Sequence, residues 1–184
     1  MNTIESAVRA ARTLSVALLA GVCATAGAQA AGASGKAVLS GYSDGVAGAS
    51  LMAGDYSRVI AELGWRGSLY QSDALSASTN LCVAYVMART WQKADSMCDE
   101  ALDVARQNEG DLLLYTRALR AEHVAIAYSN RAVLRWLEAR PEAVAHDLAR
   151  ARAFAPQAAF VAQNTAVISA GGSAAIASVV ARQR

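Results

Sequence analysis

The sequence predicts a mostly helical, all-α fold, and three observations carry this prediction. Alanine is the commonest residue, and only two prolines, Pro141 and Pro156, interrupt the chain. No stretch alternates apolar and polar residues as a half-buried strand does. Apolar residues instead recur at helical spacing, as in Val83, Val86, Met87 and in Val133, Trp136, Leu137.

Residues 1–30 predict a secretory signal peptide. Arg9 and Arg12 form a positive start, and the apolar run LSVALLAGVCA (14–24) is shorter than the about 20 residues that cross a bilayer. Small residues then allow cleavage after Ala30. An amphipathic helix on a cytosolic protein is the alternative. We therefore expect a periplasmic or secreted protein.

The mature chain would be nearly neutral. The whole sequence carries 17 Lys and Arg against 15 Asp and Glu, and removing residues 1–30 lowers the net charge from +2 to +1. A nucleic-acid-binding protein would show a clustered basic face, so we expect no nucleic-acid partner. No later apolar run is long enough to predict a membrane span after cleavage.

Three similar stretches begin at asparagines. NLCVAYVMAR starts at Asn80, NRAVLRWLEAR at Asn130 and NTAVISAGG at Asn164. The last two asparagines lie 34 residues apart and the first two 50 apart, which is one 34-residue period plus an insertion of 16. Each asparagine opens a first helix, which a short turn and a second helix follow. Thr90 suits an N-cap after the first turn, and Pro141 suits the first position of a helix.

This pattern resembles the tetratricopeptide repeat (TPR), a 34-residue helix–turn–helix. Cys82 stands at the small position after the asparagine, Tyr85 at the aromatic one, and Ala94 and Ala101 at later small positions. The resemblance implies an α-solenoid of about three to four antiparallel helical pairs. In the next unit, Ala132, Leu148 and Ala151 match the family pattern. Arg131 and Arg135 depart from it, because they stand where the family has leucine and tyrosine.

The expected organisation follows from this register. It comprises a signal peptide (1–30), a flexible mature N-terminus (31–41) and a repeat domain (42–184) with units at 42–70, 74–106, 122–156 and 158–184 and a helical insertion at 107–121. The last unit would place a second helix at 173–184. The insertion either extends the helix that begins at 122 backwards or forms a separate helix.

The resemblance also implies a binding surface, because the first helices of such units line a concave groove where proteins or peptides dock. The groove residues carried over from the family pattern are Val83, Val86, Met87, Ile126, Val133, Trp136, Leu137 and Phe160. This surface is apolar, with Trp136, Met87 and Phe160 as candidate anchors. Valines at 83 and 133 replace the polar ligands of a carboxylate clamp, which disfavours that mode.

Two functions remain open. One is a non-catalytic periplasmic adaptor or scaffold that binds a protein or peptide partner in the groove. The other is a self-associating structural subunit of the cell envelope, with its groove filled internally by the insertion or by a second copy in a homodimer. We expect no catalytic residue, cofactor or metal. Asp95, Asp99 and Asp103 share one helix face, which predicts a solvated surface, and His123 and His146 are expected to face solvent or cap helices.

Cys82 and Cys98 are the even pair that remains after signal cleavage. The repeat register places them at equal distances from the turn near residue 90, on two antiparallel helices. A Cα separation within disulfide reach, up to about 6.8 Å, follows from that placement. We predict a structural disulfide, with two buried thiols or redox or metal chemistry as the alternatives.

Overall fold

The structure is a computed structural model that describes residues 35–64, 73–107, 114–171 and 176–182. The predicted signal peptide and its cleavage site lie outside these residues. Within the described ranges, no helix combines the length and the apolar character that crossing a membrane requires.

The described residues form seven helices and two strands. In chain order they are β1 (Ala37–Tyr42), α1 (Gly48–Met52), α2 (Tyr56–Leu63), α3 (Ala74–Met87), α4 (Trp91–Gln107), α5 (Leu114–Leu137), α6 (Pro141–Phe154), α7 (Ala159–Ser169) and β2 (Ile176–Arg182). The chain is therefore mostly helical, as predicted, but the two strands were not expected.

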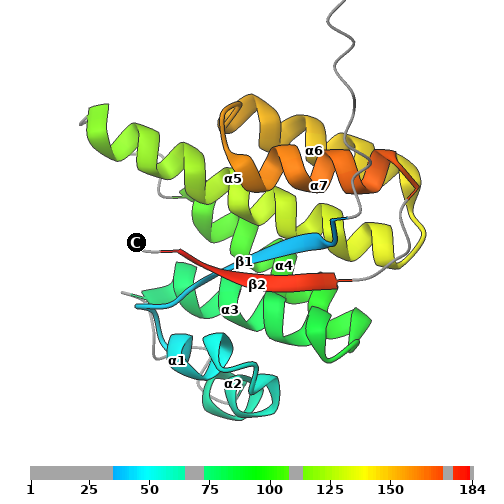
Figure 1. Cartoon of the computed structure of the whole chain (residues 1–184). Helices are drawn as coiled ribbons and strands as arrows, with labels where there is room; N and C mark the ends of the chain where they lie inside the picture. Colours follow the sequence, from blue (N-terminus) through cyan, green and yellow to red (C-terminus); the bar gives the residue numbers. More distant parts are fainter. Residues whose placement is uncertain (1–34, 65–72, 108–113, 172–175, 183–184) are drawn as a thin grey trace, which may run out of the picture. The chain divides into compact units, whose positions relative to one another are not determined.

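Two helical hairpins, α3–α4 and α5–α6, form the centre of the fold (Figure 1). Their turns have the same geometry. Arg89 and Ala139 end the first helix of each hairpin in the left-handed region, both with φ of 56°. In both turns the next residue's N–H bonds to the carbonyl five residues before it at 2.9 Å, which closes the helix end. The two turns lie 50 residues apart, the same separation as Asn80 and Asn130.

The part of the predicted insertion that the structure describes belongs to α5. This helix begins at Leu114, so residues 114–121 extend the helix predicted from 122 backwards, which was one of the two expected outcomes. Residues 108–113 of the insertion lie outside the described residues.

β1 and β2 form a two-stranded parallel sheet that lies across the first helices of the hairpins (Figure 1). The register pairs Ala37 with Ile176 at one end and Tyr42 with Arg182 at the other. β1 contacts α3, α5 and α7, so it touches the helix that follows the hairpins as well as the hairpins themselves. The sheet thus occupies the place where the sequence predicts a groove.

Both strands correct the sequence predictions. Residues 37–41 were expected to be flexible, yet every residue of β1 is buried. Because both faces are covered, the strand shows no polar alternation that a sequence pattern could detect. The second helix expected at 173–184 is instead β2 over its described part. Its sequence IASVVAR is rich in β-branched residues, and β1 supplies the partner strand that such residues need.

Candidate functional site

Three asparagines, one each on α3, α5 and α7, hold the backbone of β1. Each side-chain amide makes two hydrogen bonds to a single strand residue: Oδ1 accepts from the backbone N–H, and Nδ2 donates to the backbone carbonyl. The pairs, with these two distances in order, are Asn80 with Tyr42 (2.8 and 3.0 Å), Asn130 with Ser40 (2.8 and 2.8 Å) and Asn164 with Val38 (2.7 and 2.8 Å). We call these three side chains the asparagine ladder.

The asparagine ladder takes the place of a neighbouring strand. Its contacts fall on alternate residues of β1, whose N–H and C=O groups point to the same edge. The other edge of β1 pairs with β2, and the N–H of Ser43 continues that pairing by donating to the Arg182 carbonyl at 3.0 Å. β1 is therefore bonded along both edges. The three amides are at most 1% exposed, so their hydrogen bonds to β1 satisfy polar groups that burial would otherwise leave unpaired.

The sequence identifies these asparagines by their regular spacing but predicts no structural role for them. A usable signal was present, because Asn80 directly precedes the apolar run LCVAYVM and a buried amide requires partners. The partner itself could not be read from the sequence. Asn164 binds a strand residue 126 positions away, and no local pattern reports such a distance.

The predicted groove is not open in this structure. Five of the eight predicted groove side chains are buried: Val83, Val86, Ile126, Val133 and Phe160. Val83, Val86 and Val133 belong to the same core cluster as Leu39 of β1. Ile126 and Phe160 belong to the same core cluster as Tyr42 of β1. The apolar surface of the helices is thus covered by an apolar strand of the same chain, which removes it from water. For a filled groove, the sequence predicts the insertion or a second copy of the chain as the filling, whereas the structure fills the groove with β1.

The three remaining predicted groove residues stay half-buried. They are Met87, Trp136 and Leu137, and all three pack at the margin of the cluster that contains Leu39. Val179 of β2 is half-buried at the same cluster. These side chains form the part of the predicted groove that the two strands leave accessible.

The sequence of β1 fits its site closely. A Cβ atom on Gly41 would lie 2.3 Å from Leu51 Cδ2 and 3.2 Å from Asn80 Oδ1. A Cβ atom on Gly45 would lie 2.4 Å from the Cβ atom of Ser76. Since Cβ contacts this short require a displacement of the neighbour, the strand and the turn after it depend on glycine at both positions.

The two arginines that depart from the family pattern bind one buried carboxylate. Asp147 on α6 is fully buried; Arg131 bonds to it through Nε and Nη2 at 2.9 and 2.8 Å, and Arg135 through Nη1 at 2.7 Å. Arg131 also bonds to Asp99 on α4 at 2.6 Å. Burial acts to lower the pKa of Arg131, but the hydrogen bonds to the two carboxylates outweigh it and raise the pKa. The side chains of Arg131 and Arg135 therefore link α5 to α4 and α6.

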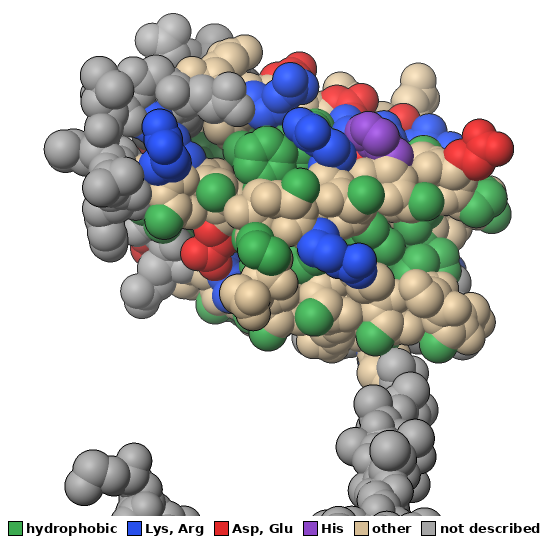
Figure 2. Space-filling view, turned by 90° about the horizontal axis from the view of Figure 1, so that it is seen from above, with side chains coloured by type: hydrophobic (Ala, Val, Ile, Leu, Met, Phe, Trp, Pro, Cys, Tyr) green, Lys and Arg blue, Asp and Glu red, His purple; other side chains and the backbone are tan. Residues whose placement is uncertain are grey.

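The aspartates expected on a solvated face of α4 are partly paired. Asp99 bonds to Arg131, and Asp95 bonds to Arg140 at 2.8 Å, so this face joins the next hairpin. In the part of the chain that the structure describes, no three His, Cys, Asp or Glu side chains are grouped as a metal site. On the face drawn in Figure 2, basic side chains lie at several separate places, with acidic side chains among them.

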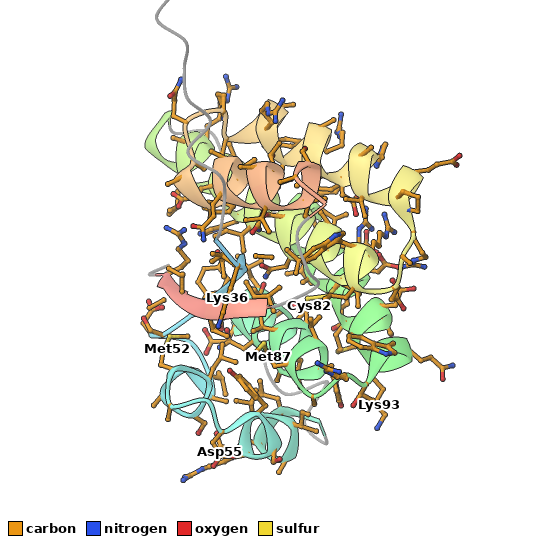
Figure 3. All side chains as sticks on the ribbon, turned by 45° about the vertical axis from the view of Figure 1, so that its right-hand side comes forward. Lys36, Met52, Asp55, Cys82, Met87 and Lys93 are labelled. Carbon is orange, nitrogen blue, oxygen red and sulfur yellow. A yellow bond between two sulfur atoms is a disulfide. The ribbon has the colours of Figure 1, made fainter. Side chains whose placement is uncertain are left out.

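Cys82 on α3 and Cys98 on α4 lie at disulfide distance, as predicted, with their Cα atoms 4.7 Å apart. Both side chains are buried, at 1% and 0% exposure. Figure 3 shows Cys82 within the layer of helices, whereas Lys93 reaches away from it. The pair joins the two helices of one hairpin from the inside, which is the placement of a structural bridge.

His123 is not the solvent-facing or capping residue that the sequence predicted. It is half-buried on α5, and its ring meets the ring of Tyr42 edge-on, with centroids 5.5 Å apart. Desolvation by burial lowers the pKa of His123, against a smaller opposing effect of Glu122. The imidazole therefore belongs to the packing that holds the end of β1. His146 by contrast is exposed.

Comparison of the chain with protein-family models, with curated proteins and with solved structures returns no match. What the site binds must accordingly be inferred from its own contacts.

Proposed function

We propose that this chain is an exported, non-catalytic adaptor of TPR-like architecture that binds a protein partner through an extended segment. The asparagine ladder carries the proposal. Three helices each present one buried amide, and together the amides hold alternate residues of a single extended strand. The first helices thus form a surface suited to extended polypeptide rather than to a small molecule.

The ladder recognises main-chain groups. Each amide bonds to one N–H and one C=O, and every residue except proline carries both. Such contacts provide affinity with little dependence on side chains, as in other proteins that bind peptides as added strands. Because β1 satisfies the ladder, the ladder holds β1 in place as the strand with which a partner segment pairs.

The accessible margin of the groove supplies apolar anchors for that partner. Met87, Trp136 and Leu137 are half-buried at the margin of the core cluster that contains Leu39, and a large aromatic side chain at such a margin is a frequent centre of binding energy. This assignment narrows the predicted eight-residue groove to the three side chains that stay accessible while both strands are in place.

Export is part of the proposal. The first 30 residues have the charge and the apolar core of a signal peptide. Buried cysteines at disulfide distance fit an oxidising compartment, where such a bond persists. The periplasm or the extracellular space is therefore the proposed location.

A second candidate function rests on a specific observation. Because β1 fills the groove from within the chain, the molecule also fits a structural subunit that associates with copies of itself. Sedimentation velocity of the mature protein separates the two. A species that grows with concentration favours the structural subunit, and a monomer favours the adaptor.

The adaptor is tested by capture of cell-envelope proteins on the immobilised mature chain, with quantification by mass spectrometry. Trp136→Ala is expected to reduce recovery of a specific partner while helicity stays near that of the unchanged protein. Trp91→Ala is the matched control, because Trp91 is also half-buried but begins α4. Equal recovery with all three proteins would contradict the assignment of Trp136 as an anchor.

A further inference from the structure

β1 is fixed in the fold by several independent contacts. All six of its residues are buried, and Leu39 and Tyr42 are both at 0% exposure. The asparagine ladder binds one edge of the strand. Removing β1 would expose the core and break six hydrogen bonds made by three buried amides. The strand is therefore a permanent part of the molecule, and its second edge is a preformed template for one further strand.

β2 occupies that template with a weaker hold. Val179 and Val180 are half-buried, and Ala181 is exposed, in contrast to every residue of β1. The backbone of β2 pairs with β1, and the Arg182 carbonyl also accepts from the Ser43 hydroxyl at 3.2 Å. Over the residues 179–182, less apolar surface therefore leaves the core when β2 separates than when the fully buried β1 does.

One hydrogen bond shows which residues of β2 turn their backbone N–H and C=O groups toward β1. The Arg182 carbonyl accepts from the Ser43 N–H, so Arg182 turns its backbone groups toward β1. Strand residues alternate with a period of two, which directs the backbone groups of Val180 to β1 and those of Val179 away from it. These two adjacent valines are both half-buried, but they also differ in side-chain packing, because Val179 packs against the core cluster that contains Leu39.

One side chain of β2 occupies a site for a cation. The guanidinium of Arg182 lies over the ring of Phe160, 4.6 Å from its centroid, and Nη1 lies 4.0 Å from Glu122 Oε1. The face of an aromatic ring and a carboxylate both attract positive charge. A strand on the β1 edge is thus selected for a basic residue opposite Tyr42.

We propose that a partner protein docks by replacing β2 with an extended segment of its own, parallel to β1 and with a basic residue over Phe160. This inference rests on the proposed adaptor function and names the surface and the chemistry of the partner. The segment carries β-branched or small residues directly before the basic one, as Val179, Val180 and Ala181 do in β2. Backbone pairing along the β1 edge supplies the affinity, and the cation site sets the register.

The test uses the mature chain and a fluorescein-labelled peptide of sequence IASVVAR, followed by fluorescence anisotropy. The tethered β2 competes at an effective concentration in the millimolar range, so the unchanged protein is expected to bind the peptide weakly. Val180→Pro removes an N–H that faces β1 and weakens the tethered strand. The matched control Val179→Pro removes an N–H on the outer side, where proline is tolerated.

We expect Val180→Pro to bind the peptide about tenfold more tightly than Val179→Pro, because only the first removes a hydrogen bond that the tethered strand makes to β1. A peptide with the Arg182→Ala change should bind about threefold more weakly, through loss of the cation contact. The reversed sequence RAVVSAI, bound parallel to β1, has no basic residue at the position opposite Tyr42 and should also bind about threefold more weakly. Equal affinity of the two proline variants, or no binding to Val180→Pro, would overturn strand replacement.

Further measurements separate a failure of strand replacement from misfolding of the variant, from self-association and from a failure of the adaptor function. Circular dichroism checks that Val180→Pro folds; should it unfold, Arg182→Ala in the full chain replaces it, with an expected gain of about threefold in peptide affinity. A dimer of the unchanged protein that Val180→Pro dissociates and Val179→Pro does not would assign the edge to a second copy and overturn the partner assignment. Failure of the peptide test leaves the capture test with Trp136→Ala unaffected, so the adaptor function stands or falls separately.

Discussion

The side-chain amide of Asn130 holds both backbone polar groups of Ser40, a residue 90 positions away in the chain. Oδ1 accepts from the Ser40 N–H and Nδ2 donates to its carbonyl, each at 2.8 Å, and both residues are only 1% exposed. This contact is the middle one of the three in the asparagine ladder, so its removal tests how strongly the helices hold β1.

Replacing the middle amide should destabilise the fold. Asn130→Ala leaves a buried N–H and a buried carbonyl of Ser40 without partners, which costs about 3 kcal/mol of unfolding free energy. Urea denaturation measures the loss, and hydrogen exchange should show faster exchange at the Ser40 amide. The control Gln163→Ala removes an exposed hydrogen bond to Lys36 and should cost less than about 0.5 kcal/mol. Similar losses in both variants would mean that the ladder does not hold β1.

The buried carboxylate should matter far more than its exposed neighbour. Asp147→Asn removes the charge that two half-buried arginines share, which should cost about 3 to 5 kcal/mol because buried cations lose their counter-charge. Asp99→Asn acts on a side chain that is 51% exposed and should cost less than about 1 kcal/mol. Thermal or urea unfolding compares the two. A larger loss for Asp99→Asn would contradict the proposed centre of the network.

The cysteine pair should behave as a bridge. Denatured, unreduced mature protein should show no free thiols, and reduction should lower the unfolding free energy by about 3 kcal/mol in the chain-entropy model. The double variant Cys82→Ala with Cys98→Ala provides the control, since its stability should not respond to the reductant. Two free thiols before reduction would show that the bond is not formed.

The close approach of β1 to α1 can be tested with one methyl group. Gly41→Ala places a Cβ atom against Leu51 and should cost about 1 to 3 kcal/mol through overpacking. Gly35→Ala adds the same methyl group where its nearest neighbour, a Val167 methyl carbon, is 3.6 Å away, so the expected change is less than about 0.5 kcal/mol. Unfolding midpoints in urea compare the variants. Equal stability would place Gly41 away from Leu51 in solution.

Stability should fall in mild acid because of His123. Burial lowers its pKa in the folded state below the ordinary value of about 6.5, so the unfolded chain binds more protons in that range. The contribution of His123 is present above about pH 6.5 and is lost as the pH falls through the lowered folded pKa. His123→Gln should remove this component when unfolding free energy is measured against pH. The same pH dependence in the variant would assign it to other groups.

The sequence alone determined the features that local rules control. Apolar spacing in α4 and α6 reports which face of each helix is buried, because a helix repeats every 3.6 residues wherever it packs. In α3, by contrast, every residue from Ser76 to Val86 is buried, so its spacing marks no single face. The equal distances of Cys82 and Cys98 from a turn bring them together in any antiparallel hairpin, and the structure places them at disulfide distance. The spacing of the asparagines likewise marked the positions on α3, α5 and α7 that bind β1 in the same way.

Only the tertiary structure decided what fills the groove. β1 and β2 lie at opposite ends of the described chain, and each becomes a strand because the other, together with the asparagine ladder, supplies its hydrogen bonds. Full burial removes the alternation by which β1 could have been detected. Helical hydrogen bonds close within four residues and leave a trace in the local sequence. Strand hydrogen bonds are satisfied at a distance, so their partners emerge only when the chain is folded.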